Sequence, residues 1–351
     1  MYPRTRILGA ALALALAPAA AQAATVYIPQ GSAGSVAVVD STTDGVVARL
    51  TGMPAVHGLG GAPGARYLVA GSYAETQAGA TEVAKPEGVS EDEHAAHHGG
   101  AAAPDPDGGR SVGLLTVLDA ADGTPVRRLE VPGAVHHIAV SPDGAVAVAT
   151  LPNDDGVSIV RLSDLTVRPL VRTGPLPNYV AFSPDGSRAY VSNSGNGTVS
   201  EIDVERGIVR RNLIAGESPE HLVMAPDGGT LYAIDAEAGS VIALSLATGE
   251  AAGSFAIGGA LHGLDLSDDG KTLFVSGRDR DELLAIDLAS GRQRRLELAP
   301  APYHVAAVRG TGKLYVSSRD EPKVWVVDQA SLETLGIIEI EGEGHQMVVL
   351  P

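Results

Sequence analysis

The chain has 351 residues, of which 44% are hydrophobic, and this is enough apolar material for a large core. Its formal net charge of −17 disfavours binding to nucleic acid or to anionic membranes and attracts cations instead. The sequence contains no cysteine, which excludes disulfide bonds and thiolate metal sites.

The first 23 residues have the pattern of a secretory signal peptide. Arg4 and Arg6 precede an apolar run over residues 7–16, and Ala21-Gln22-Ala23 fits a small-x-small cleavage site. No later stretch reaches the ~20 consecutive apolar residues that a membrane helix needs. We therefore expect residues 24–351 to be an exported, periplasmic, monomeric protein that is not inserted in the membrane, with a net charge of −19 once the two arginines are removed.

Four short strands are predicted in the best-formed part of the chain. Residues 180–182 end in a Pro-Asp-Gly turn, and residues 189–192, 198–202 and 208–214 are further β-forming runs. Turn-forming residues at 193–197 separate the second and third runs. Variants of this unit, which is about forty residues long, fill the rest of the chain.

The residue that begins each innermost strand recurs with a regular period. From His136 onward the markers are separated by 42, 42, 42, 42 and 41 residues, and they are His136, Asn178, Glu220, His262, His304 and His345. His57 precedes this series by 79 residues because an insert at about 73–110 lies between them. Repeats of ~40–45 residues with four strands each are typical of a β-propeller.

The two ends of the chain are predicted to share one blade. Residues 25–28, 35–40 and 46–50 form only three strands, and residues 345–350 form a lone strand that completes the set. Closure removes the sheet edges that would otherwise pair with other chains. The prediction is an all-β protein, a seven-bladed propeller of four-stranded antiparallel blades that contains no helix.

The strand at Tyr190-Val191-Ser192-Asn193 resembles the YVTN repeat of secreted bacterial seven-bladed propellers. Similar tetrapeptides recur at 231–234, 273–276 and 314–317. The resemblance covers essentially all of the mature chain and implies its fold. Propellers have many functions, so function has to be inferred from the side chains on the ring.

All ten histidines are predicted to lie on one face. The loop that enters an innermost strand and the loop between strands two and three share a face, opposite the Ser-Pro-Asp-Gly turns. Seven histidines begin innermost strands, namely His57, His136, His137, His221, His262, His304 and His345. The other three, His94, His97 and His98, lie in the insert between strands two and three of the first blade.

Histidines in matched register favour a metal site over a merely polar channel lining, because imidazole is the commonest metal ligand. His57, His136, His262, His304 and His345 occupy equivalent positions, and Glu220 is the one carboxylate in the series. His137 and His221 are also candidate metal ligands, but they fall one residue later, so strand alternation predicts that their side chains point differently. They would contact a second ion, orient a ligand of the first, or only pack. Zinc is the expected metal and copper the second choice, since copper(I) carriers use cysteine and methionine.

The insert contains an acidic stretch with the three remaining histidines, at residues 91–100, and has no strand or helix periodicity. Together with the ring, it resembles the periplasmic zinc metallochaperone propellers of the AztD type. That resemblance implies a zinc chaperone whose mobile loop captures the ion. The partner would be a periplasmic metal-receiving protein such as a zinc-binding solute protein. The sequence has no enzyme motif, neither a nucleophile elbow nor a phosphate loop, so we do not expect an enzyme.

Three alternatives remain open. The His136-His137 pair resembles part of the histidine-lined copper cluster of nitrous oxide reductase. Tetrapyrrole-binding propellers of haem-cd nitrite reductases and their maturation proteins also use histidines at the top of the channel. There, Arg172, Arg278, Arg280 and Arg319 would pair with the ligand carboxylates. A protein-interaction propeller is the third alternative.

Overall fold

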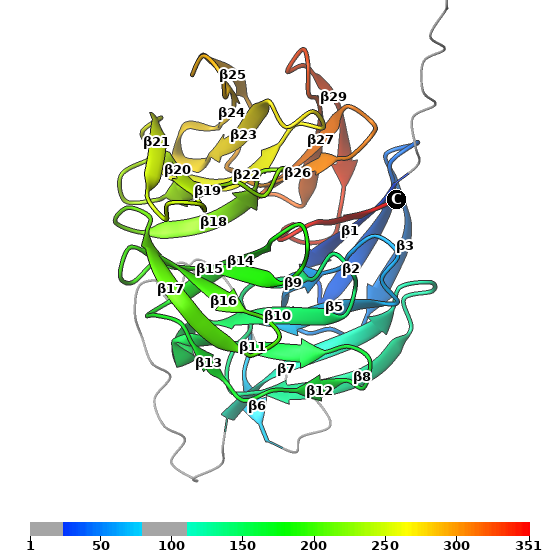
Figure 1. Cartoon of the computed structure of the whole chain (residues 1–351). Coiled ribbons are helices and arrows are strands. Elements are labelled where there is room, and N and C mark those ends of the chain that lie inside the picture. Colours follow the sequence, from blue (N-terminus) through cyan, green and yellow to red (C-terminus); the bar gives the residue numbers. More distant parts are fainter. Residues whose placement is uncertain (1–23, 79–110) are drawn as a thin grey trace, which may run out of the picture.

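The computed structural model describes residues 24–78 and 111–351. The predicted signal peptide at 1–23 and the insert histidines His94, His97 and His98 lie outside the described residues. The described residues form seven antiparallel sheets arranged around a ring (Figure 1). The predicted all-β seven-bladed propeller is therefore confirmed.

Blades 1 to 3 follow one another along the chain, and each begins with its innermost strand. Blade 1 consists of β4 (Val56–Gly60), β5 (Tyr67–Ser72), β7 (Ser111–Asp119) and β8 (Pro125–Val131). Blade 2 consists of β9 (Ile138–Val140), β10 (Val146–Leu151) and β11 (Gly156–Arg161), with β12 (Thr166–Val167) and β13 (Val171–Arg172) both paired to β11. Blade 3 consists of β14 (Pro177–Phe182), β15 (Arg188–Asn193), β16 (Thr198–Asp203) and β17 (Ile208–Ile214).

Blades 4 to 6 repeat the same order from the channel outward. Blade 4 consists of β18 (Pro219–Met224), β19 (Thr230–Asp235), β20 (Ser240–Ser245) and β21 (Ala251–Ala256). Blade 5 consists of β22 (Leu261–Leu266), β23 (Thr272–Gly277), β24 (Glu282–Asp287) and β25 (Gln293–Glu297). Blade 6 consists of β26 (Pro302–Val308), β27 (Lys313–Ser318), β28 (Lys323–Asp328) and β29 (Thr334–Glu339).

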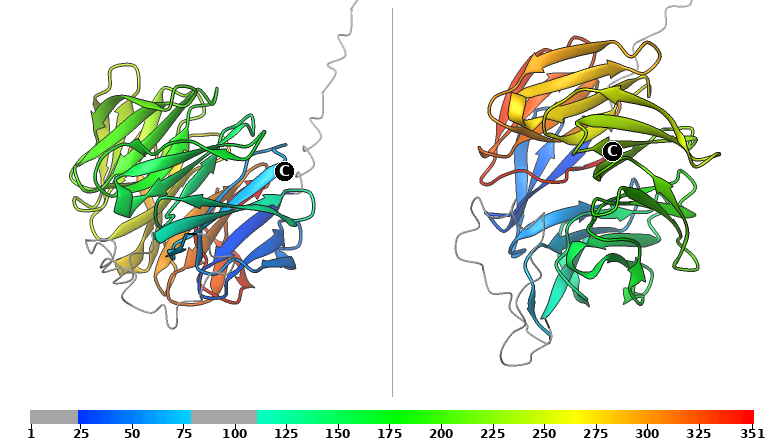
Figure 2. Two further views of the ribbon diagram at one scale, coloured as in Figure 1. Left: turned by 90° about the horizontal axis from the view of Figure 1, so that it is seen from below. Right: turned by 90° about the vertical axis from the view of Figure 1, so that its left-hand side faces the viewer.

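Blade 7 joins the two ends of the chain, as predicted. Its strands are β30 (Val348–Leu350), β1 (Thr25–Gln30), β2 (Ser35–Asp40) and β3 (Gly45–Thr51). β30 pairs antiparallel with β1, with Leu350 opposite Thr25. Figure 2 shows the result from two sides, with the blue N-terminal strands lying beside the red and orange C-terminal ones.

The core lies between neighbouring blades, because alternate residues of a strand face opposite sides of its sheet. On β15, Ala189 and Val191 pack against blade 2 residues such as Val148. Tyr190, between them, packs against blade 4 residues such as Leu231. Each sheet is thus apolar on both faces, which is why the strands have buried residues at consecutive positions.

Three details differ from the sequence predictions. The last strand begins at Val348, not at 345, because a single bridge between Gly344 and Gln30 and one extra residue precede it. The start of the insert extends the sheet, where β6 (Thr76–Gln77) pairs with β7. Two 3-10 turns, η1 (Pro152–Asp154) and η2 (Arg278–Arg280), occur where no helix was expected. No helix within residues 24–78 and 111–351 is long and apolar enough to cross a membrane.

Candidate metal centre

Each innermost strand begins with a β-bulge, in which two of its residues lie opposite one residue of the next strand. In blade 5, Leu261 pairs with Gly277 and Leu264 with Val275, so that His262 and the following glycine share a single partner. The same shift occurs at the start of β4, β14, β18 and β26. In blade 2, Thr150 exchanges backbone hydrogen bonds with both His136 and His137.

The bulges give fourteen positions around the top of the channel, two for each blade. The first positions are His57, His136, Asn178, Glu220, His262, Tyr303 and His345. The second positions are Gly58, His137, Tyr179, His221, Gly263, His304 and Gln346. All seven histidines of the described residues occupy these positions, and all seven are buried.

The seven imidazoles form one continuous cluster. Along the ring, centroid distances are 4.2 Å between His345 and His57, 4.7 Å between His57 and His136, and 4.1 Å between His136 and His137. The cluster continues with centroid distances of 4.8 Å from His137 to His221 and 4.3 Å from His221 to His262 of blade 5. The ring of His304, in blade 6, has a centroid distance of 4.9 Å to both His221 and His262.

Backbone contacts hold His137 in one orientation. Its Nδ1 lies 2.9 Å from the carbonyl oxygen of Asn178, and its backbone nitrogen donates to Thr150 Oγ1 at 2.9 Å. A carbonyl oxygen only accepts hydrogen bonds, so Nδ1 carries the hydrogen and Nε2 keeps the lone pair. That Nε2 is buried and has no hydrogen-bond partner among the described residues. This is the arrangement that prepares an imidazole for a metal ion.

Two groups of three histidines bring ligand atoms within 4.8 Å of one another. We call them triad A, which is His57, His136 and His137, and triad B, which is His137, His221 and His304. Every member is buried, and His137 belongs to both triads. In triad B, His304 Nε2 is also without a hydrogen-bond partner among the described residues. Either triad offers the three imidazoles of an open zinc site.

The prediction that His137 and His221 point differently from the other ring histidines is wrong. The bulges interrupt strand alternation at these residues, so the second positions also face the channel. His304 is likewise not equivalent to His262, because Tyr303 occupies the first position of blade 6. The sequence contains a signal of this difference. Leu261 and Pro302, which begin two successive innermost strands, are 41 residues apart, whereas the equivalent residues of the preceding blades are 42 apart.

Burial keeps the shared part of the cluster neutral. Desolvation, followed by the neighbouring imidazoles His136, His221, His304 and His57, holds the pKa of His137 well below 6.5. Desolvation and three neighbouring imidazoles do the same to the pKa of His304. Neutral imidazole is the form that binds metal, so these ligands need no deprotonation at neutral pH.

Glu220 lies beside the cluster but belongs to neither triad. Its Oε2 is 3.7 Å from Nδ1 of His262, whose ring stacks on Tyr303 at a centroid distance of 3.7 Å. Burial raises the pKa of Glu220 to about 7, while the positive charge of Arg278 lowers it. Glu220, His262 and His345 therefore extend the cluster at its edges, and their membership of the metal site stays a prediction.

Gln346, which was not predicted as part of the site, bridges two innermost strands. Its Oε1 accepts hydrogen bonds from the backbone nitrogens of Leu59 at 3.3 Å and Ile138 at 3.1 Å. Its Nε2 donates to the carbonyl oxygen of Ile138 at 2.8 Å. One amide thus ties together the strands that carry His57 and His137. Its position directly after His345, where another blade has His137, is the signal that points to it.

Two aspartates near this face, Asp235 and Asp279, bond to the backbone and belong to neither triad. Asp235 accepts hydrogen bonds from the backbone nitrogens of Glu217 and Ser218, both at 3.0 Å. Asp279 accepts one from Ala260 at 2.9 Å. These side chains stabilise the loops that enter the innermost strands. No resolved residue within 24–78 and 111–351 completes either triad with an acidic ligand within 4.8 Å.

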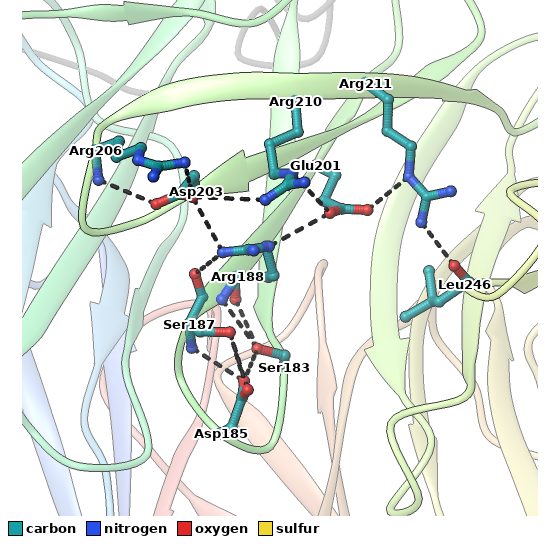
Figure 3. Close-up of polar contacts among 10 residues, drawn as sticks. All are labelled: Ser183, Asp185, Ser187, Arg188, Glu201, Asp203, Arg206, Arg210, Arg211 and Leu246. Carbon is teal, nitrogen blue, oxygen red and sulfur yellow. Dashed lines mark hydrogen bonds and ion pairs between the residues drawn. The ribbon is translucent and has the colours of Figure 1, made fainter.

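A second polar cluster lies at the opposite end of blade 3, near the Ser-Pro-Asp-Gly turn (Figure 3). Glu201 contacts three guanidinium groups, with the shortest distance 2.7 Å to Arg211 Nε. Asp203 also contacts three, and the nearest is Arg188 at 3.3 Å. A hydrogen bond from the Arg206 backbone, together with nearby arginines, lowers the pKa of Asp203. This cluster, Arg188, Glu201, Asp203, Arg206, Arg210 and Arg211, is called the arginine–carboxylate cluster below.

A family model described as outer membrane protein assembly factor BamB matches residues 32–335. The chain belongs to this family. The YVTN-repeat and AztD resemblances are not confirmed by the match and stay predictions. No curated protein matches the chain significantly.

Solved structures confirm the fold of this BamB-family chain. A chain of Kuenenia stuttgartiensis hydrazine synthase is similar with a TM-score of 0.65 and 20% identity, over 83% of this chain and 88% of that one. A protein of Bacteroides fragilis described as a candidate 6-phosphogluconolactonase has a TM-score of 0.69 and 14% identity, over 95% and 100% of the two chains. At these identities the likeness concerns the fold alone.

Proposed function

We propose that this protein is a periplasmic metal-binding protein that takes up a zinc ion in its histidine ring and passes it to a partner. The observation that carries the proposal is the convergence of buried imidazoles in two triads, with His137 Nε2 lacking a hydrogen-bond partner among the described residues. A buried polar nitrogen without a partner is costly, and a bound ion removes that cost.

The ligand set favours zinc. Zinc takes nitrogen ligands in tetrahedral geometry, and sites with three protein ligands keep the fourth position open for water or another donor. An open position suits transfer, because a donor from the receiving protein can enter before the imidazoles leave. The sequence has no cysteine and four methionines, so it lacks the soft ligands that select copper(I). Copper(II) is the second choice.

Binding and transfer fit these residues better than catalysis. The predicted AztD-type arrangement adds a capture step by His94, His97 and His98 and a periplasmic acceptor such as a zinc-binding solute protein. A tetrapyrrole fits less well, because imidazoles at centroid distances of 4.1–4.9 Å leave no slot for a planar macrocycle among them. The same packing would accommodate a copper cluster only after side chains rearrange.

A second candidate is a scaffolding role in outer membrane protein assembly, which the family description suggests. A scaffold would use the outer surface of the ring, and a buried histidine cluster would be incidental to it. Both candidates place the protein in the periplasm. They differ in whether zinc binding matters, and that difference can be measured directly.

The first test is zinc binding to the purified mature protein by isothermal titration calorimetry. We expect tight binding by the wild type and a loss of more than about 100-fold in His137→Ala, since even a supporting residue of a metal site is worth about 10- to 100-fold. Gln329→Ala is a matched control, because this glutamine is also buried but bonds Asp268 at the other end of blade 6. Equal affinity in wild type and His137→Ala would contradict the proposal.

The second test measures transfer. Zinc-loaded protein is mixed with a periplasmic zinc-binding solute protein, and the rate of exchange is compared between wild type and a triple His94, His97, His98→Ala variant. Slower transfer at unchanged affinity supports a delivery role for the insert. No transfer in either form, combined with an outer membrane assembly defect in cells lacking the protein, would favour the scaffold.

A further inference from the structure

The two triads share one ligand, His137, and this sharing determines how they can be occupied. Its Nδ1 donates a hydrogen bond to the Asn178 carbonyl at 2.9 Å, which leaves Nε2 as the only lone pair. One lone pair binds one ion. To bridge two ions, His137 would have to lose the Nδ1 hydrogen and set a bare nitrogen against a carbonyl oxygen.

Electrostatics also oppose simultaneous occupation. The triads adjoin one another, with centroid distances of 4.8 Å between His137 and His221 and 5.4 Å between His57 and His137. Two dications at such a separation in a buried site repel strongly. Among the described residues, the triads contain no carboxylate that would offset this repulsion.

We infer that triad A and triad B are alternative positions of a single metal ion, and that His137 stays bound while the ion moves between them. This inference rests on the proposed function. When the ion shifts from A to B, it exchanges His57 and His136 for His221 and His304, so it is never released from all its ligands. The exchanged ligands come from blades 1 and 2 in triad A and from blades 4 and 6 in triad B.

Gln346 and Tyr179 lie beside the shared histidine and the strands of triad A. The amide of Gln346 bonds the backbone at Leu59 and Ile138. Tyr179, at the second bulge position of blade 3, packs against His137 and His221 from the same region. Apolar residues of β4, β9, β14 and β30 line a cavity of about 210 Å³ that these two side chains also border. No member of either triad lies among the residues that line this cavity.

The test counts zinc ions in full-length mature protein whose His94, His97 and His98 are alanine, so that only the ring is measured. The probe is zinc ion, quantified by native mass spectrometry and by calorimetric titration. Variant A carries His57→Ala and His136→Ala, variant B carries His221→Ala and His304→Ala, and the third variant is His137→Ala. Thermal melts check that each is folded, and glutamine replacements serve where alanine does not fold.

We call the protein that carries only the three insert substitutions the ring background. We expect one zinc ion in the ring background, one in variant A and one in variant B. Removing one of two equally good positions weakens the apparent affinity only roughly twofold, because the other position remains. His137→Ala should lose binding by more than about 100-fold, since it removes a ligand from both triads.

Other outcomes distinguish a failure of the inference from a failure of the proposed function. Two ions in the ring background and one in each double variant would mean independent sites, which overturns the inference and leaves the proposed function standing. One ion in the background but none in one double variant would mean a single fixed site, which also overturns it. No zinc in the ring background would overturn the proposed function itself. The ring-background count can be read even if every substituted variant fails to fold.

Discussion

The two polar clusters of this propeller solve the problem of burying polar groups in opposite ways. In the arginine–carboxylate cluster each of two acids, Glu201 and Asp203, contacts three guanidinium groups. In the histidine ring the groups are of one kind and are held neutral by burial, as the lowered pKa of His137 shows. The arginine–carboxylate cluster borders solvent, whereas the imidazoles are buried.

Of these two clusters, only the histidine ring needs a ligand to satisfy its polar atoms. Opposite charges satisfy one another, so the arginine–carboxylate cluster is complete with protein atoms alone. Imidazoles packed against imidazoles cannot all do so, and His137 and His304 keep an Nε2 without a partner among the described residues. A site built for binding has unsatisfied groups, and a site built for structure does not.

The largest expected effect comes from deleting residues 344–351. The deletion removes β30, together with His345 and Gln346, and opens sheet edges in blade 7. We expect the free energy of unfolding to fall by about 4 kcal/mol or more, and zinc binding to be lost with it. Denaturant titration measures the first quantity and calorimetry the second. Deleting Pro351 alone, which is exposed, is the control. An unchanged unfolding midpoint would contradict the closure of the ring.

The stability of the metal-free protein should depend on pH through the histidine ring and not through the arginine–carboxylate cluster. An unfolded imidazole takes up a proton below pH 6.5, whereas folded His137 and His304 do so only at much lower pH. The unfolded state then binds more protons, so stability falls as pH falls below 6.5. Glu220 acts in the opposite sense, since its pKa rises from 4.5 to about 7 on folding.

In the pH interval just below 6.5, the two imidazoles outweigh the one carboxyl. Each group changes the free energy of unfolding by about 1.4 kcal/mol per pH unit, so the net slope from these three groups is about 1.4, rising with pH. Glu220→Gln should roughly double that slope, because it removes the opposing term. Urea titrations at several pH values measure it. Asp203 has a lowered pKa and stays charged throughout this range, so Asp203→Asn should leave the slope unchanged.

The next effect concerns the support of the ring. Gln346→Ala should weaken zinc binding about 10- to 100-fold, as expected for a residue that positions ligands without touching the ion. Gln329→Ala, which breaks a similar inter-strand contact at the other end, should leave zinc affinity unchanged. Calorimetry of both variants decides the matter. Equal losses would mean that the ring responds to general loosening of the propeller and not to Gln346 itself.

The smallest effect is expected at the arginine–carboxylate cluster. Glu201→Gln should lower the free energy of unfolding by only ~1 kcal/mol, because its ion pairs are partly exposed to solvent. The loss should shrink in high salt, and zinc affinity should not change. A change in zinc affinity in this variant would mean that the two ends of the propeller are coupled. It would contradict the view that the two clusters act independently.

Much of the architecture follows from local chemistry that recurs along the chain. The 42-residue spacing and the three-plus-one division of the ends predict seven blades and their closure, and the structure confirms both. The face on which the seven described histidines lie is predictable for the same reason, since strand order fixes which loops meet. The family relationship to BamB was not predicted, because a YVTN-like tetrapeptide at Tyr190–Asn193 is a short signal shared by many propellers.

The repeat spacing is enough to predict the ring, the number of blades and the strand entrances at which the seven described histidines lie. Which of these histidines converge depends on the packing of the blades. The period-two rule for strands predicts a different direction for His137 and His221, but a bulge places two residues opposite one and turns both toward the channel. Neighbouring blades also pack closely at Gly58, where a Cβ would lie 2.6 Å from the carbonyl oxygen of His136 in the next blade. Convergence depends on contacts between blades, which no single repeat encodes.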